Sequence, residues 1–261
     1  MTGKKASAVA VVGLLSLMAP VALAHTLIGT DGPDQLLGTG LPDQLYGESG
    51  EDTLSGAGGS DYLEGGSGND QIDGGPGLDL AIGGTGNDAI DAGPGDDVVY
   101  AGAGDDLVLG GAGSDTLFGQ AGADRLFGGP GADRIYASDP DYVDGGSGAD
   151  WISANAGDTT IFGGPGRDAI TATAGDYRVF GGSGADRIHT GGGADEVDGG
   201  PGNDVIAAGA GADSINVRDG RRDSVRCGPD HDTVTADELD LLTGCETVNQ
   251  AAPPQSRSAT F

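Results

Sequence analysis

The sequence predicts an all-β repeat protein, built as a stack of nine-residue units that each contribute one very short strand. Three observations predict this fold class. A period of nine residues runs from residue 29 to residue 216, one position of each unit is always apolar, and 54 of the 261 residues are glycine. An ordinary packed core is not expected, because only 5% of the residues are aromatic and glycine far exceeds its usual share.

The period becomes clear when the chain is written in nines from Gly29, which gives twenty-one units almost without gaps. Twelve units cover residues 29–136, one eight-residue unit covers 137–144, and eight further units cover 145–216. A typical unit, starting at residue 65, reads GGSGNDQID. We number the units from 1 to 21 in chain order.

Each position of the unit has a physical role. The eighth position is apolar in every unit, from Leu36 to Ile215, as a very short strand with one inward face requires. The preceding glycines permit positive φ, so a tight turn can direct its backbone carbonyls towards one point. Aspartate at the sixth position, such as Asp70, adds a carboxylate beside those carbonyls.

Carbonyl and carboxylate oxygens without His or Cys suit a hard cation. Ca²⁺ accepts six to eight oxygen ligands in flexible geometry, whereas Mg²⁺ is less tolerant. The net charge of -29 also favours cations as partners and argues against nucleic acid or an anionic membrane surface, which are themselves negative. Such a composition is also found in disordered chains, but the regular order of the residues favours a folded repeat.

The unit matches the pattern GGxGxDxUx, and from residue 29 to about 216 the chain strongly resembles the RTX, or haemolysin-type, calcium-binding family. The resemblance implies a right-handed parallel β-roll (a solenoid) with two units per turn, so that alternate units stack. It also implies multiple Ca²⁺ ions, held between stacked turns by backbone carbonyls and sixth-position aspartates. By match to the motif, the predicted metal ligands are Asp34, Asp43, Asp52, Asp61, Asp70, Asp79, Asp88, Asp97, Asp106, Asp115, Asp124, Asp133, Asp150, Asp168, Asp186, Asp195, Asp204 and Asp213.

Departures from the pattern fall on odd-numbered units. Units that start at residues 137, 154 and 172 lack the glycine pair, and in the last two Thr159 and Tyr177 replace the sixth-position aspartate. Because alternate units stack, we expect calcium to be distributed unequally, with a gap on the edge that the odd-numbered units form.

The first 24 residues are typical of a secretory signal peptide. Two lysines, the only ones in the chain, precede an apolar run that ends in the small-x-small cleavage site Ala22-Leu23-Ala24. The run is shorter than the roughly 20 apolar residues of a membrane span, so a membrane anchor is the less favoured interpretation. We expect cleavage after Ala24, secretion to the extracellular space, and a mature chain that starts at His25 and has no membrane span.

The pattern degrades after Asn216. Cys227 and Cys245 are the only cysteines, and an even count in an exported protein predicts one disulfide, with free buried thiols as the alternative. A cap is expected here, because an open end of a stack presents unpaired strand edges. The predicted segments are 1–24, a signal peptide; 25–216, a calcium-binding β-roll; 217–250, degenerate repeats and a disulfide cap; and 251–261, a disordered tail.

The leading functional hypothesis is a non-enzymatic, secreted calcium-binding protein that folds on Ca²⁺ and acts as an extracellular scaffold or binding protein. A hydrolase or a toxin-related protein is the rival class, because many relatives in this family carry such a domain ahead of their repeats. The sequence contains no HExxH and no GxSxG motif, and His25, His189 and His231 are scattered. We therefore predict no catalytic residues and no cofactor other than calcium.

Adhesion to cell-surface polysaccharide or protein is the third hypothesis. It rests on aromatic residues at the ninth position, which can mark a contact surface or simply shield a thin core. These residues are Tyr100, Phe118, Phe127, Tyr136, Phe162 and Phe180.

Overall fold

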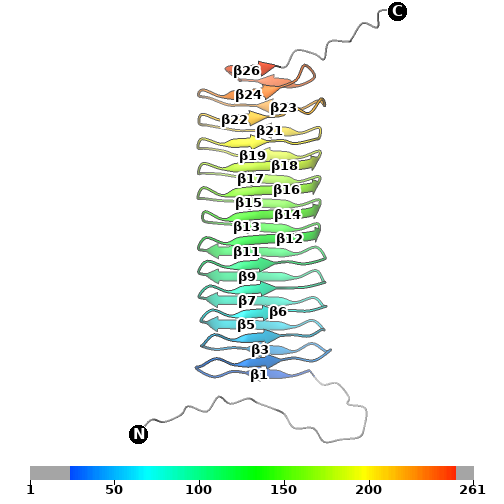
Figure 1. The fold of residues 1–261 in the computed structure, drawn as a ribbon, viewed down its shortest axis with the longest axis vertical. Coiled ribbons are helices and arrows are strands. Elements are labelled where there is room, and N and C mark those ends of the chain that lie inside the picture. Colours follow the sequence, from blue (N-terminus) through cyan, green and yellow to red (C-terminus); the bar gives the residue numbers. More distant parts are fainter. Residues whose placement is uncertain (1–23, 251–261) are drawn as a thin grey trace, which may run out of the picture.

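The computed structural model describes residues 24–250, which form a long, narrow β-solenoid (Figure 1). Within this range every regular element is a strand, so the part of the chain that the structure describes contains no helix able to cross a membrane. The predicted signal peptide, apart from Ala24, and the predicted tail at 251–261 lie outside the described residues.

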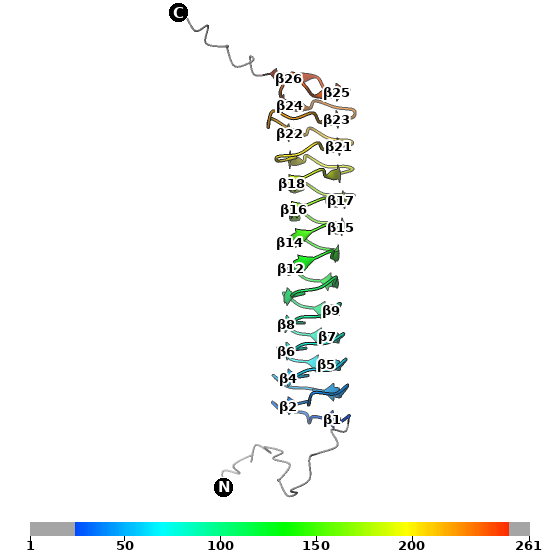
Figure 2. The same cartoon turned by 90° about the vertical axis from the view of Figure 1, so that its right-hand side faces the viewer.

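Two parallel sheets of 13 strands lie face to face (Figure 2). The chain alternates between them, so odd-numbered strands form sheet A and even-numbered strands form sheet B. Sheet A comprises β1 (Thr26–Ile28), β3 (Gln44–Tyr46), β5 (Tyr62–Ser67), β7 (Leu80–Thr85), β9 (Val98–Ala103), β11 (Thr116–Ala121), β13 (Arg134–Ala137), β15 (Trp151–Ala154), β17 (Ala169–Ala172), β19 (Arg187–His189), β21 (Val205–Ala207), β23 (Ser224–Arg226) and β25 (Leu241–Thr243). Sheet B comprises β2 (Gln35–Leu37), β4 (Thr53–Ser55), β6 (Gln71–Asp73), β8 (Ala89–Asp91), β10 (Leu107–Leu109), β12 (Arg125–Gly131), β14 (Tyr142–Gly148), β16 (Thr160–Gly166), β18 (Arg178–Gly184), β20 (Glu196–Asp198), β22 (Ser214–Asn216), β24 (Thr233–Ala236) and β26 (Thr247–Gln250).

Stacked units pair residue for residue. In sheet A, Leu45 pairs with Leu63 and Leu63 with Ala81, a step of two units. The eight-residue unit shortens one step in sheet B, where Leu126 pairs with Val143, yet the parallel pairing continues. The predicted all-β parallel solenoid with two units per turn is therefore confirmed.

The eighth-position side chains form the core between the two sheets. From Leu45 to Ile215 they are at most 2% exposed, whereas Leu36 in the first unit is only half-buried. Full burial of such a side chain contributes about 1.5–3 kcal/mol. Because each layer contains only one such side chain per sheet, the core stays thin along the whole length.

The turns between the sheets line the two long edges of the solenoid (Figure 1). We call the turns that lead into sheet A, which belong to the even-numbered units, edge A. The turns that lead into sheet B, which belong to the odd-numbered units, form edge B. A sixth-position residue directly precedes each strand, as Asp61 precedes β5, so each edge carries one column of these residues.

Both sheets continue beyond the last nine-residue unit through β23, β24, β25 and β26. Val225 and Val234 extend the core there, each at most 1% exposed. Cys227 and Cys245 form the predicted disulfide, with Cα atoms 5.2 Å apart.

Candidate metal centres along the two edges

The sixth-position aspartates form two inward-facing columns, one on each edge, and from Asp43 onwards they are at most 3% exposed. One carboxylate oxygen, Oδ1, accepts a hydrogen bond from the backbone of the preceding turn. The backbone N–H groups of Asp52 and Asp70, for example, donate to Oδ1 of Asp70 and Asp88, both at 2.8 Å. The aspartates thus connect each turn to the next.

The other oxygen, Oδ2, is buried and has no hydrogen-bond partner in eighteen of the aspartates that the structure describes. We call these the orphan carboxylates. Those of edge A are Asp61, Asp79, Asp97, Asp115, Asp133, Asp150, Asp168, Asp186, Asp204 and Asp223. Those of edge B are Asp52, Asp70, Asp88, Asp106, Asp124, Asp195, Asp213 and Asp232.

Each orphan oxygen shares its surroundings with a backbone carbonyl. At Gly65, the first residue of its unit, a Cβ would lie 2.4 Å from Oδ2 of Asp70 and 2.7 Å from the carbonyl oxygen of Gly83. The same convergence recurs at Gly128, where the distances to Asp133 Oδ2 and the Gly145 oxygen are both 2.5 Å. Glycine keeps this space open, and the orphan Oδ2 atom and a carbonyl oxygen both face it.

The turns also bring backbones into close contact. At Gly68 φ is +131°, and a Cβ there would lie 1.6 Å from the carbonyl oxygen of Gly50 in the turn below. Glu48, Ala57 and Gln120, which occupy the second position of their units, adopt φ of 69–73° in the left-handed region that glycine normally occupies. The stacking geometry therefore fixes the turn conformation even where the residue is unsuited to it.

The burial of so many carboxylates is electrostatically unfavourable. Desolvation, with a smaller contribution from neighbouring aspartates, raises the pKa of Asp88, Asp97 and Asp124 to about 7. Within residues 24–250 no orphan carboxylate forms an ion pair with Arg or His. A buried, unpaired charge of this kind is costly unless a cation or a proton neutralises it.

The donor set fits calcium. The described residues contain no cluster of three or more His, Cys, Asp or Glu side chains, so a bound ion would take most of its ligands from backbone carbonyls. Hard oxygen donors in a flexible arrangement are what Ca²⁺ accepts. The orphan Oδ2 atoms and carbonyls such as that of Gly83 would hold the ion, which would supply the missing positive charge.

Comparison with known proteins agrees with this geometry. The RTX calcium-binding nonapeptide repeat matches the chain at residues 28–63, 37–72, 46–81, 73–108, 82–117, 109–139, 137–170, 144–179 and 180–215. The chain belongs to this RTX family.

A search of curated proteins finds no significant match to this RTX chain. Among solved structures, a similar chain is described as a hyperactive, Ca²⁺-dependent, beta-helical antifreeze protein from an Antarctic bacterium. It is 20% identical, with a TM-score of 0.39, and the alignment covers 90% of this chain and 82% of that chain.

The structure separates the RTX ligands predicted from the motif into two groups. All but Asp34 and Asp43 carry an orphan oxygen. In those two, a threonine at the second position of the same unit supplies the donors. Thr30 and Thr39 each donate a backbone N–H and a hydroxyl to Oδ2 of Asp34 and Asp43, respectively.

Three buried aspartates in the same columns were missed by the motif match, namely Asp141, Asp223 and Asp232. Asp223 and Asp232 carry orphan oxygens. They lie in segments that have lost the glycine pattern, but each still precedes its inward valine by two residues, and this spacing could have identified them. Asp141 is different, because the N–H groups of Ser138 and Asp124 donate to its two oxygens.

Edge B is interrupted where the sequence predicts a gap. Thr159 and Tyr177 occupy the buried sixth position, at 0% and 1% exposure. The Thr159 hydroxyl donates to the carbonyl of Asp139 at 2.8 Å, and the Tyr177 hydroxyl donates to the carbonyl of Ala174 at 3.1 Å. These hydroxyl protons satisfy turn carbonyls without a cation. The displaced carboxylates of Asp158 and Asp176 are exposed.

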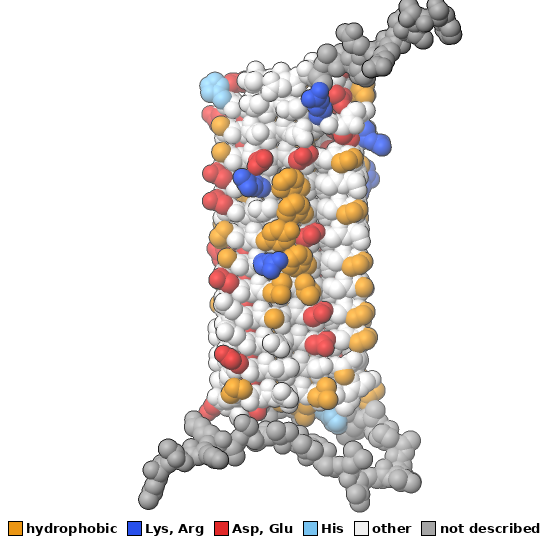
Figure 3. Space-filling view, viewed as in Figure 1, with side chains coloured by type: hydrophobic (Ala, Val, Ile, Leu, Met, Phe, Trp, Pro, Cys, Tyr) orange, Lys and Arg blue, Asp and Glu red, His pale blue; other side chains and the backbone are white. Residues whose placement is uncertain are grey.

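The ninth-position aromatics separate onto the two outer faces. Tyr100, Phe118 and Tyr136 stack in sheet A with centroids 4.7 and 4.5 Å apart. Phe162 and Phe180 stack in sheet B at 4.8 Å. Figure 3 shows a row of hydrophobic side chains running along one face, with charged side chains beside it. Stacked rings cover one another's faces, so a smaller part of each ring is exposed.

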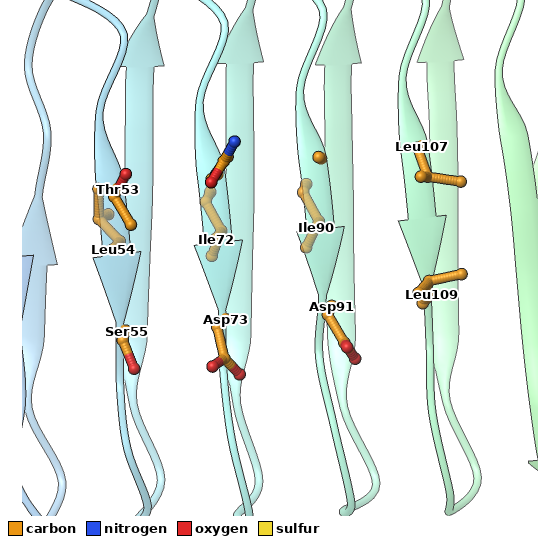
Figure 4. A pocket seen from close by; sticks show the side chains of 11 residues that line it. Thr53, Leu54, Ser55, Ile72, Asp73, Ile90, Asp91, Leu107 and Leu109 are labelled. Atoms are coloured by element: carbon orange, nitrogen blue, oxygen red, sulfur yellow. The ribbon is translucent and has the colours of Figure 1, made fainter. Parts of the chain in front are cut away.

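A shallow groove of about 410 Å³ lies on sheet B, across β4, β6, β8 and β10 (Figure 4). Its titratable side chains are Asp73 and Asp91, which are outward residues separate from the inward columns. The lining residues include no His, Cys or Lys.

Proposed function

We propose that this RTX chain is an exported, extracellular calcium-binding protein that folds around Ca²⁺ and acts as a scaffold or binding protein, not as an enzyme. The observation that carries the proposal is the set of eighteen buried orphan carboxylates. We assign the calcium sites to these carboxylates and to the turn carbonyls that converge with them. The ions would be more numerous on edge A, where the series is unbroken from Asp61 to Asp223.

Coupling of calcium binding to folding follows from the charge and the thin core. A net charge of -29 opposes compaction, and each layer buries little apolar surface. A ligand that binds the folded chain and not the unfolded chain adds its binding free energy to stability. We therefore expect much of the stability of the solenoid to come from bound calcium.

An extracellular location is supported by two features. The Cys227–Cys245 disulfide suits an oxidising compartment. The sequence of residues 1–24 has the features of a signal peptide, with cleavage after Ala24. The C-terminal strands β23–β26 and the disulfide would act as the cap of the stack.

The test is far-ultraviolet circular dichroism of the mature protein at neutral pH, with chelator and then with added Ca²⁺. The expected result is a largely disordered spectrum in chelator and a β spectrum with calcium. Magnesium at the same concentration serves as the control and should be less effective, because it requires stricter geometry. A strong β spectrum in chelator at neutral pH would contradict the proposal.

A further inference from the structure

The N-terminal end of edge A holds a carboxylate that does not need calcium. We propose that cleavage after Ala24 makes the α-ammonium group of His25 the counterion of Asp43, so that the processed N-terminus closes edge A in place of a metal ion. This inference rests on the export proposed above. It assigns a structural role to a group that only processing creates.

The register places His25 one turn below Asp43. Thr26 pairs with Gln44, and the N–H of Gln44 donates to the carbonyl of His25 at 2.7 Å. The backbone nitrogen of His25 donates to Oδ1 of Asp43 at 2.5 Å. His25 thus occupies the sixth position of the first turn, where later turns have the amide of an aspartate.

The contact between His25 and Asp43 differs from the other contacts of edge A in its donors and in its charge. In the next turn, the neutral amide of Asp43 donates to Asp61 at 2.7 Å, and Oδ2 of Asp61 remains an orphan. Asp43 instead has both oxygens occupied, because Thr39 donates to its Oδ2 at 2.6 and 2.9 Å. A positively charged nitrogen at His25 would also neutralise the Asp43 carboxylate, so that protein groups alone satisfy it.

The position of the signal-peptide cleavage determines whether the new ammonium group reaches Asp43. The small-x-small motif locates it before His25, and the strand register independently places the nitrogen of His25 on Asp43. Cleavage one residue earlier would move the ammonium by about 3.3 Å along the chain and leave a neutral amide at Asp43. Asp43 is only 2% exposed, so loss of the positive charge there is not fully compensated by water.

The consequence is that processing and ordering of the first turns are coupled. The precursor has a peptide bond at His25 and cannot supply the charge. The first strands β1 and β3 should therefore be less ordered in the precursor than in the mature protein at the same calcium concentration.

The mature chain is well suited to a direct test, because both lysines precede residue 25 and the α-amino group is its sole primary amine. Three calcium-loaded forms would be compared, one starting at His25, one starting at Ala24, and one starting at His25 with its amino group acetylated. Each form would also be made with Asp43→Asn. Asp34→Asn is the matched control, because Asp34 lies in the first turn of edge B.

Hydrogen exchange of the β1 and β3 peptides and the rate of amine acylation are the two readouts. We expect severalfold slower exchange in the His25 form than in the other two, and slower acylation than in the Ala24 form. Both differences should disappear in Asp43→Asn and persist in Asp34→Asn. Equal exchange in the three forms, or differences that persist in Asp43→Asn, would overturn the inference.

N-terminal sequencing of the natively exported protein separates this inference from the proposed function. A mature start other than His25 would overturn the role of the ammonium group while leaving calcium binding intact. If Asp43→Asn fails to fold, the comparison of the three forms with Asp43 intact still decides, because acetylation keeps every side chain and removes the charge of the nitrogen. Absence of calcium-dependent folding would refute the proposed function without affecting the coupling to Asp43.

Discussion

Between residues 137 and 190, the two edges of the solenoid differ in how the buried polar groups of their turns are satisfied. On edge A, Asp150 and Asp168 keep orphan oxygens beside open glycine positions. On edge B, at the same height, Thr159 and Tyr177 fill the equivalent positions and donate hydroxyl protons to turn carbonyls. One edge keeps buried carboxylates there that a cation or a proton would have to neutralise, and the other has hydroxyl side chains in their place.

A stacked turn can be satisfied by protein hydroxyl and amide donors as well as by a bound cation. The turn carbonyls need a positive partner, and the aspartates need a counter charge or a donor. Thr30 and Thr39 supply donors at the first turns, and Thr159 and Tyr177 supply them in the middle of edge B. A buried polar group costs free energy only while it is unsatisfied, so each device removes the need for a metal.

We expect the largest effect from a change of pH without calcium, because it changes the charge of the buried aspartates on both edges. In chelator the solenoid should be unfolded near pH 7.5 and regain β structure when the pH falls to about 4.5. Burial raises the pKa of Asp88, Asp168 and Asp204 in the folded chain from 3.8 to about 7. A raised folded-state pKa adds stability that is full below the unfolded value and is lost as the pH rises through about 7.

Circular dichroism across this pH range, with and without calcium, measures the effect. Calcium should reverse the trend, because protons compete with the ion for the same carboxylates. A calcium-free protein that is less structured at pH 4.5 than at pH 7.5 would contradict the buried-carboxylate interpretation.

A matched pair of substitutions tests the difference between the edges. Asp168→Asn on edge A should reduce the number of bound calcium ions and destabilise the calcium-loaded protein by about 3 kcal/mol, because it removes one member of a buried charge pair. In chelator the same substitution should stabilise the protein, since one unpaired carboxylate is gone. Thr159→Asn on edge B is the comparison, and it should leave the calcium count unchanged. Native mass spectrometry and thermal unfolding measure both, and equal calcium loss in the two variants would remove the distinction.

Tyr177→Phe isolates the hydroxyl of edge B. Without the hydroxyl, the carbonyl of Ala174 loses its side-chain donor, and we expect destabilisation of about 1 kcal/mol. The loss should be the same at all calcium concentrations, because no ion is involved. Tyr136→Phe, in an outward aromatic stack, serves as the control and should cost less. A calcium-dependent loss in Tyr177→Phe would indicate that an ion does occupy this turn.

We expect the smallest effect from glycine substitutions at positions with positive φ, and it should be similar on the two edges. Gln120→Gly on edge B and Ala57→Gly on edge A should each stabilise the protein by up to about 1 kcal/mol, because a left-handed conformation costs a residue with Cβ about 1–2 kcal/mol. The φ values of 69° and 72° at these positions are nearly equal, so the gains should be similar. Urea unfolding with saturating calcium measures them. A loss of stability at both positions would show that the side chains contribute more than the strain removes.

The repeating architecture could be predicted from the amino-acid sequence. The period of nine, the apolar eighth position and the aspartate before each strand follow from local needs, namely one inward side chain per strand and positive φ in each turn. The family resemblance then implied the parallel stack with two units per turn, which the register of Leu45 with Leu63 confirms. The Cys227–Cys245 bond was also predictable, because the chain has no other cysteine.

Which aspartates lack a hydrogen-bond partner could not be predicted from the motif and depends on the folded molecule. Asp43 and Asp61 are identical in the motif, yet one is held by Thr39 and His25 and the other has an orphan oxygen. Asp223 lies outside the regular repeat and still joins edge A, because the backbone absorbs the extra residue between turns. The physical reason is that a hydrogen-bond donor acts through space, from residues four positions away or one full turn away. A motif records which residue stands at a position, whereas the satisfaction of a buried oxygen depends on everything folded around it.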